Sequence, residues 1–164
     1  MKTLIIVRHA KSSWADDTQD DRDRPLNDRG KKDAPEMAKR LKEKGIRPDL
    51  FLSSPAKRAR KTARFFAEEF GGSKKEIVEE EKLYEAPSAN FYEVLGQLDD
   101  KYETVVLFSH NPGITDFANT LDTVRIDDMP TCSMLAVQAH TGHWSAFRES
   151  EKEFLFFDYP KNAS

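Results

Sequence analysis

The chain has 164 residues, of which 34% are charged and 38% hydrophobic, and its formal net charge is −3. This length suits one domain with a proper core, which we expect to span residues 1–164, and the charge argues against a general nucleic-acid binder. The single Cys132 excludes an internal disulfide and fits a reducing compartment. The N-terminal apolar run is too short for a signal peptide or a membrane span, so we expect a cytoplasmic protein.

The first predicted element is a strand at Leu4–Val7, where an apolar, mostly β-branched run leads directly into Arg8 and His9. Such a run is typical of a strand that is buried on both faces of a sheet. Ligands of open α/β sheets bind outside the carboxyl ends of the strands. Arg8 and His9 are therefore expected at a ligand-binding edge.

The polar, aspartate-rich segment that follows, residues 11–28, is interpreted as a solvated loop. It lacks the glycine turn and the closing glutamate of an EF-hand, which disfavours a calcium loop. A helix comes next, and Pro35 places its start near Lys32 or kinks it there. Gly45 ends this helix, whose apolar face consists of Ala34, Met37, Ala38 and Leu41.

A second strand is predicted at residues 49–53, followed by a helix with Ser54 as its N-cap and Pro55 as its first residue. Arg58 lies about one turn into this helix and off its apolar face, so we expect its side chain to point toward the strand ends. Residues 76–83 are ambiguous and allow an edge strand. The apolar face of the helix consists of Ala59, Thr62, Ala63, Phe66 and Phe70.

The second half of the chain continues the alternation of helices and strands. Ser88 is expected to cap a third helix, and a second buried strand follows at Val105–Phe108. Asn111 and Pro112 then cap and begin a fourth helix. Residues 134–139 and 143–148 suggest a hairpin, and residues 154–159 suggest a last strand or a tail that packs on the core. This order predicts a three-layer α/β/α sandwich with a mostly parallel sheet and an antiparallel edge.

Four side chains gather at predicted strand ends and helix starts: Arg8, His9, Arg58 and His110. Two guanidinium groups suit a tetrahedral dianion, because their fork geometry matches phosphate oxygens. The helix after Asn111 would add backbone N–H donors and its positive end. The nearby Lys11, Lys57 and Lys61 would raise the local positive potential.

A neutral histidine in such a cradle is a competent nucleophile toward phosphorus when one ring nitrogen is free and the other is hydrogen-bonded. No metal or cofactor is required, because the side chains supply the positive charge. Alone, a histidine after a strand is more often structural and an arginine in a first turn is usually a surface charge. Their joint occurrence favours a site, whereas His140 and His143 are expected to be structural or exposed.

These residues resemble the motifs of the histidine phosphatase superfamily, which has the phosphoglycerate mutase-like fold. Its Arg-His-Gly motif corresponds to Arg8-His9-Ala10, its Ser-Ser-Pro motif to Ser53-Ser54-Pro55 followed by Arg58, and its late histidine to His110. The resemblance implies that His9 is the nucleophile that becomes phosphorylated and that Arg8, Arg58 and His110 clamp the phosphate. It also suggests Lys11, Ser12 and Asn111 as substrate contacts.

Within the superfamily, the chain is most similar to the small bacterial phosphohistidine phosphatases of the SixA type, from its segments at residues 8–12, 23–30 and 109–113. Those enzymes remove phosphate from histidine on a signalling phosphotransfer domain. Ala10 in place of glycine weakens a mutase assignment. Only about thirty residues between Gly72 and Glu103 are free for a lid, and an open pocket suits a phosphoryl group presented on another protein.

The general acid is the least defined part of the site. Glu85 best matches the position of the family's acid, although an exposed loop glutamate is an equally open interpretation. An imidazole leaving group lessens the need for an acid, because its conjugate acid has a pKa of about 6.5. Two other functions remain open, a general or sugar-phosphate phosphatase and a non-catalytic module that binds phosphorylated proteins. Imidazoles on opposite faces of the sheet, or a guanidinium in an unrelated ion pair, would contradict the predicted site.

Overall fold

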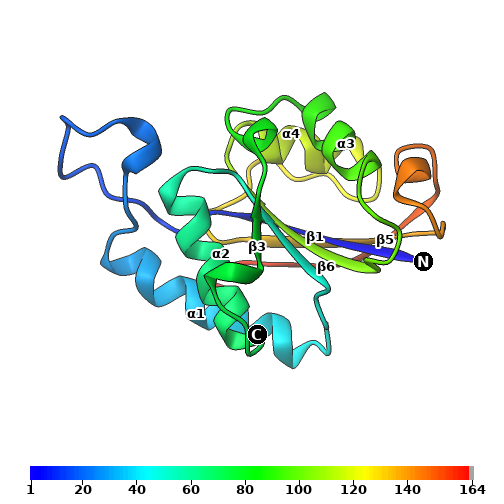
Figure 1. Cartoon of the computed structure of the whole chain (residues 1–164), viewed down its shortest axis with the longest axis horizontal. Helices are drawn as coiled ribbons and strands as arrows, with labels where there is room; N and C mark the ends of the chain where they lie inside the picture. The colour runs from blue at the N-terminus through cyan, green and yellow to red at the C-terminus, as the bar shows by residue number, and fades with distance from the viewer. Residues whose placement is uncertain (163–164) are drawn as a thin grey trace.

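A computed structural model describes residues 1–162, which form a six-stranded sheet flanked by helices (Figure 1). The strand order is β3-β2-β4-β1-β5-β6. The first four strands in this order run parallel, and β5 and β6 are antiparallel additions at one edge. The strands are β1 (Lys2–Arg8), β2 (Leu50–Ser53), β3 (Ile77–Glu79), β4 (Thr104–Ser109), β5 (Met134–Ala139) and β6 (Lys152–Asp158).

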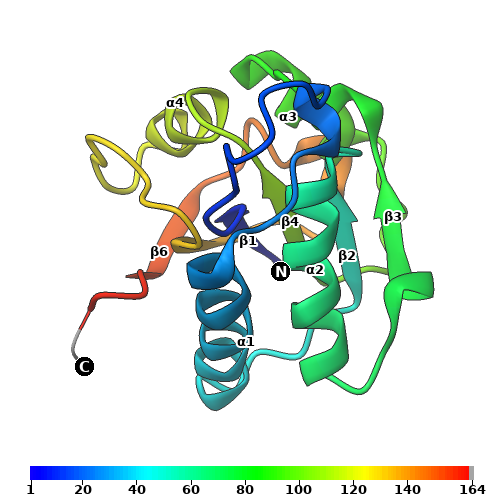
Figure 2. The ribbon, with the colours of Figure 1, turned by 90° about the vertical axis from the view of Figure 1, so that its left-hand side faces the viewer.

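Two pairs of helices cover the two faces of the sheet, as Figures 1 and 2 show. Alternate residues of β1 enter different cores: Ile5 and Val7 pack with the first helix pair, and Leu4 and Ile6 pack with the second. The predicted three-layer α/β/α sandwich is therefore confirmed. None of the helices in residues 1–162 is long and apolar enough to cross a membrane. The first pair is α1 (Asp28–Glu43) and α2 (Lys57–Glu69), and the second is α3 (Ser88–Gly96) and α4 (Gly113–Thr120).

The two buried strands predicted from the sequence are direct neighbours in the sheet. β1 and β4 run parallel, with Arg8 opposite Ser109. The register continues for one more residue, since the backbone N–H of His9 donates to the carbonyl of Ser109 over 3.1 Å. His9 and His110 consequently leave adjacent strands at the same level of the sheet's carboxyl edge.

Helix α1 begins earlier than the sequence predicts. It starts at Asp28 rather than near Lys32, because the Asn27 side chain accepts a hydrogen bond from the N–H of Gly30 over 2.9 Å. Pro35 lies inside the helix, where it removes one backbone donor. The apolar face predicted for this helix is fully buried, and its packing outweighs that loss.

The other helix starts also shift from their predicted positions. Ala56, not Ser54, precedes α2, and the Ser54 hydroxyl instead accepts from the Ala56 N–H and contacts His110. Helix α3 begins at Ser88 itself, and α4 begins at Gly113, one residue later than predicted. The ambiguous segment at residues 76–83 contains the short edge strand β3 and a 3-10 turn, Glu81–Leu83.

The predicted hairpin of residues 134–139 and 143–148 is wrong. β5 pairs with β6, and residues 144–146 form a 3-10 turn. Trp144 and Phe147 are both buried in the same core, and the Trp144 indole donates to the Tyr102 carbonyl over 2.7 Å. Two residues three apart face the same side of a helical turn, whereas a strand would place them on opposite faces.

Candidate active site

The imidazoles of His9 and His110 face each other at the carboxyl ends of β1 and β4. Their ring centroids are 5.0 Å apart, and each residue is 7% exposed. The parallel pairing of the two strands produces this arrangement, as the sequence predicted. Imidazoles on opposite faces of the sheet would have contradicted the predicted site. The short distance between the two rings excludes that arrangement.

Hydrogen bonding fixes the tautomer of His9. Its Nδ1 lies 2.7 Å from the carbonyl oxygen of Ala10, and since a carbonyl only accepts, Nδ1 carries the proton. The lone pair is then on Nε2. Burial lowers the pKa of His9 to about 3, and the nearby Arg58 and Arg8 also lower it, against the opposing effect of the Ala10 carbonyl. The ring is therefore neutral at neutral pH, with an unprotonated lone pair on Nε2.

His110 is held by Ser54, the residue expected to cap α2. The Nε2 atom of His110 lies 2.6 Å from the Ser54 hydroxyl, whose oxygen already accepts from the Ala56 N–H. With the hydroxyl donating to Nε2, the proton of the neutral ring lies on Nδ1. Burial lowers the pKa of His110 to about 2, with additional effects of His9 and Arg58. His110 is thus a neutral hydrogen-bond donor.

Both predicted arginines are anchored through their terminal nitrogens. The Nη1 atom of Arg8 donates to the Met129 carbonyl over 2.8 Å. Arg58 is 6% exposed and donates from Nη1 to the Asp21 carbonyl over 2.7 Å and from Nη2 to the Asp21 carboxylate over 3.0 Å. The ion pair of Arg58 with Asp21 belongs to the site, because both residues line the same pocket.

Three buried nitrogens of the predicted site have no hydrogen-bond partner within residues 1–162: Arg8 Nε, Arg58 Nε and His110 Nδ1. Buried polar groups almost always have partners, so three orphan groups among four neighbouring residues require an explanation. A bound tetrahedral anion provides one, since each nitrogen is a donor. The arrangement can thus hold a phosphoryl group beside the free Nε2 of His9.

Asp21 and Tyr84 belong to the site although sequence reasoning did not select them. The Asp21 carboxylate accepts from Arg58, from Arg24 Nε over 3.1 Å and from the Tyr84 hydroxyl. Burial alone would raise the pKa of Asp21, but these hydrogen bonds hold it well below its usual value. Burial and the bond to Asp21 raise the pKa of Tyr84 to about 12.

The loop before α1 is therefore not simply solvated. Arg24 is 7% exposed and donates to the Ser12 hydroxyl over 2.8 Å. Arg22 forms a two-fold ion pair with Glu81 and lies 4.3 Å from the centre of the Tyr84 ring. These contacts hold residues 11–27 against the site, so Asp21 of this loop lines the pocket together with Tyr84, Glu85 and Pro87 of the segment between residues 72 and 103.

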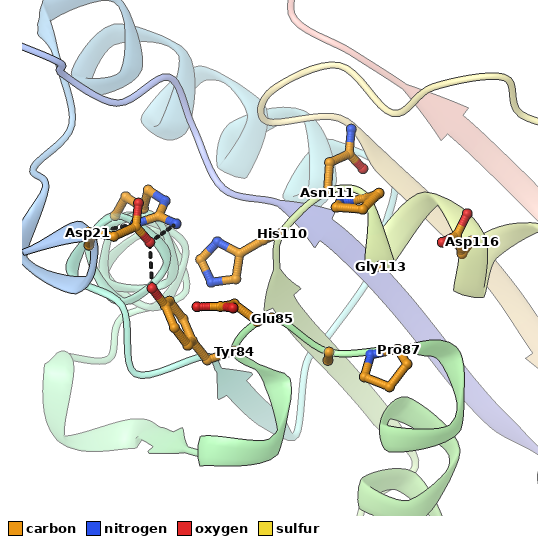
Figure 3. A pocket seen from close by; sticks show the side chains of 11 residues that line it. Asp21, Tyr84, Glu85, Pro87, His110, Asn111, Gly113 and Asp116 are labelled. Atoms are coloured by element: carbon orange, nitrogen blue, oxygen red, sulfur yellow. Dashed lines mark hydrogen bonds and ion pairs between the residues drawn. The ribbon is translucent and has the colours of Figure 1, made fainter.

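A pocket of about 520 Å³ opens in front of His110 (Figure 3). Glu85 lines it, is exposed, and has a left-handed backbone with φ of 50°. Gly113 is required by the tight contact of two loops, because a Cβ there would lie 1.9 Å from the Ala86 carbonyl oxygen. The pocket residues are Asp21, Arg58, Tyr84, Glu85, Ala86, Pro87, His110, Asn111, Pro112, Gly113 and Asp116.

The three further substrate contacts suggested by the sequence lie differently from one another. Asn111 lines the pocket, but its side chain bonds Asp128, Met129 and Thr115. Ser12 accepts from Arg24 and supports that side chain. Lys11 is exposed and lines a separate hollow, so the structure does not bring it to the pocket.

The other cations and histidines considered in the sequence also lie outside this pocket. Lys57 and Lys61 line a hollow between α2 and β3. His140 and His143 are exposed and lie near Glu153 and Asp100, which confirms that they are not part of the site. In the described residues, no three His, Cys, Asp or Glu side chains form a group that could hold a metal ion.

A family model described as the histidine phosphatase superfamily (branch 1) matches residues 4–91, more than half of the chain. The chain therefore belongs to the histidine phosphatase superfamily. An uncharacterized chloroplastic protein of Arabidopsis thaliana, At3g52155, is 32% identical over 158 residues, which cover 87% of this chain and 69% of the relative.

Solved structures of two SixA proteins resemble the whole fold. SixA of Agrobacterium tumefaciens has a TM-score of 0.79 and 25% identity, with 97% of this chain and 98% of the other covered. The protein histidine phosphatase SixA complexed with tungstate has a TM-score of 0.81 and 19% identity, with 99% of each chain covered. The phosphoglycerate mutase-like fold and the assignment to a phosphatase family are thereby confirmed.

Proposed function

We propose that this protein is a phosphohistidine phosphatase that removes the phosphoryl group from a phosphorylated histidine on a signalling protein. The observation that carries the proposal is the free, neutral Nε2 of His9 beside the three orphan donors of Arg8, Arg58 and His110. A free imidazole nitrogen next to a group of anion-binding donors favours covalent phosphoryl transfer over simple binding of a phosphorylated partner.

The reaction proceeds by in-line attack of His9. Its Nε2 lone pair forms a bond to phosphorus while the bond from phosphorus to the substrate nitrogen breaks. The departing imidazole leaves as a neutral ring after it takes up a proton, which is accessible near neutral pH because its conjugate acid has a pKa of about 6.5. Arg8, Arg58 and His110 hold the phosphoryl oxygens as charge shifts between them.

A water molecule completes the cycle. Its oxygen bonds to phosphorus, the bond from phosphorus to His9 breaks, and orthophosphate leaves with His9 neutral again. The two guanidiniums and the His110 N–H balance the negative charge in both steps. We therefore expect turnover without a metal ion, and the test is an assay in EDTA, in which activity should be unchanged.

The substrate assignment is supported by the likeness to SixA proteins and by Ala10, which departs from the family's Arg-His-Gly motif. A histidine phosphotransfer domain is the partner that we propose. The free and buried Cys132 fits the reducing cytoplasm, the compartment that we propose for the protein. A pocket of about 520 Å³ also has room for a small organic leaving group, which keeps a sugar-phosphate phosphatase as the second candidate.

Labelling experiments test this function. Brief reaction with a phosphohistidine protein labelled with ³²P should leave acid-labile, alkali-stable label on the enzyme and none on His9→Ala. No label on the wild-type protein, or label that persists in His9→Ala, would contradict His9 as nucleophile. Turnover is then compared for a phosphohistidine protein, an aryl phosphate and a sugar phosphate. Equal or faster turnover of the sugar phosphate would select the second candidate.

A further inference from the structure

The pocket in front of His110 has an inner and an outer part of opposite charge. The inner part holds the buried Arg58 side chain and the His110 donor. The outer wall carries the carboxylates of Asp21, Glu85 and Asp116, and Arg58 is the single Lys or Arg among the residues that line it. A phosphoryl group and its leaving group would therefore meet different surroundings.

The outer carboxylates differ in how far they are neutralised. Asp21 is paired with Arg58 and Arg24. Glu85 and Asp116 are exposed, and within residues 1–162 neither has a Lys, Arg or His nitrogen inside 4.0 Å. Both cations of the cradle are committed to the phosphoryl group once it binds. The leaving group would then face two uncompensated negative charges.

A second observation shows that this wall belongs to a ligand site and is not only an acidic stretch of surface. His110 is 7% exposed and lines the same pocket, and its Nδ1 has no partner in the part of the chain that the structure describes. Figure 3 shows its ring between Asp21 on one side and Asn111 on the other, with Glu85 close by. The buried donor is where a phosphoryl group would bind, and Glu85 and Asp116 line other parts of the same pocket.

We infer that the substrate carries a positive charge beside its phosphoryl group, which Glu85 and Asp116 recognise. This inference rests on the proposed phosphoryl transfer and narrows its substrate class. Phosphorylated histidines flanked by Lys or Arg fit, as do aminoalkyl phosphates. Phosphate esters that carry a carboxylate do not fit, because like charges would face each other across the pocket.

The expected size of the effect follows from the exposure of both carboxylates. Exposed ion pairs are weak, so each carboxylate should favour a cationic over a neutral substrate by roughly two- to fivefold in kcat/KM. An anionic substrate should be disfavoured by a similar factor. The preference should decrease at high salt, because exposed charges are screened.

The test compares kcat/KM for matched pairs of substrates on the full chain. One pair is an aminoalkyl and a carboxyalkyl phosphate of equal length, and the other is a phosphohistidine peptide with flanking lysines or flanking glutamates. We expect the cationic member of each pair to react at least fourfold faster at low salt. A ratio at or below one in both pairs would overturn the inference.

Substitutions of Asp116 test whether this carboxylate causes the preference for cationic substrates. Asp116→Asn, which keeps the size of the side chain, should reduce the cationic-to-anionic ratio about fourfold or more, and the charge reversal Asp116→Lys should reduce it further. Glu43→Lys on the remote surface of α1 makes the same charge change and should leave the ratio unaltered. If Asp116→Lys does not fold, the Asn variant decides, and an unchanged ratio rejects the role of Asp116.

The same data separate this inference from the proposed function. If phosphohistidine peptides react equally well with either flank and the alkyl pair shows no cationic preference, the inference fails and the phosphohistidine phosphatase stands. If the aminoalkyl phosphate is preferred and no phosphohistidine peptide is turned over, the proposed substrate fails and the charge selectivity stands. The two peptides and two alkyl phosphates also distinguish a protein from a small-molecule source of the positive charge.

Discussion

Asp21 binds both terminal nitrogens of Arg58, and the Nε of the same guanidinium has no partner among residues 1–162. A guanidinium has two edges that can bind an anion, one made by the terminal nitrogens and one that includes Nε. Asp21 occupies the first edge and so fixes the direction in which the second is presented. It acts as a positioning residue for Arg58, and Tyr84 holds its carboxylate in place.

Asp21→Asn should weaken the hold on Arg58, because an amide oxygen cannot accept all three of the present hydrogen bonds. The Asp21 side chain is 43% exposed, so we expect a loss of about 1 kcal/mol, or about fivefold in kcat/KM for an aryl phosphate. Binding of orthovanadate should weaken in parallel. Tighter vanadate binding would instead show that Asp21 competes with the anion for the Arg58 guanidinium.

A double-mutant cycle decides whether Asp21 acts through Arg58. In an Arg58→Ala background, Asp21→Asn should cause no further loss of kcat/KM. If the two losses multiply, Asp21 contributes independently of Arg58. Thermal unfolding of all three variants checks that the fold is intact.

The stability of the protein should decrease as the pH falls below about 6.5. Both active-site histidines have pKa values lowered by burial, to about 3 for His9 and about 2 for His110, so the unfolded chain binds more protons than the native state below pH 6.5. The contribution of the two histidines to the free energy of unfolding is therefore complete above that pH and declines toward pH 3. Melting temperatures at pH 7, 6 and 5 measure this, before most carboxylates titrate. His110→Gln should flatten the profile, and an equally steep profile in that variant would contradict the cause.

Gly113→Ala should destabilise the protein and disturb the pocket. The new Cβ would lie 1.9 Å from the Ala86 carbonyl, so α4 or the loop at residues 85–87 must move. We expect a loss of roughly 1–3 kcal/mol, as for other overpacked sites, together with reduced kcat. Gly96→Ala is the matched control, since nothing lies within 4 Å of its added Cβ. Chemical denaturation compares the two, and equal stabilities would show that the contact relaxes freely.

Glu85→Gln tests whether Glu85 is a general acid in addition to its inferred part in recognising a cationic substrate. With an alkyl phosphate, loss of a general acid should lower kcat by about 10²-fold or more. With a phosphohistidine peptide the change should be small, because the leaving imidazole has a conjugate-acid pKa of about 6.5. Gln keeps the left-handed backbone at φ 50° unaltered. An equal effect on both substrates would remove Glu85 from the role of acid.

Residues next to the buried strands were predictable because their positions follow from their chain neighbours. Arg8, His9 and His110 must emerge where apolar strands end, and Arg58 follows from the spacing of the helix around it. Ser54 was recognised in the motif but expected at the N-cap position of α2, which Ala56 occupies without a side-chain capping hydrogen bond. Its contact with His110 joins residues 56 apart in the chain, which no local pattern expresses.

Asp21 was beyond sequence reasoning for a related reason. The loop before α1 contains several aspartates in similar local surroundings, and nothing in their order distinguishes the one that meets Arg58 and Tyr84, 37 and 63 residues away. Trp144 shows the same limit, because its burial against residues around Tyr102 outweighs the alternation that suggested a hairpin strand.

The sequence by itself determined the layers of the fold and the four reactive side chains, because apolar periodicity and the ends of strands are local properties of the chain. Only the tertiary structure decided how those side chains are oriented, which of their nitrogens have hydrogen-bond partners, and which loops line the pocket. These features depend on contacts between distant segments, whose free energies are fixed when the layers pack together.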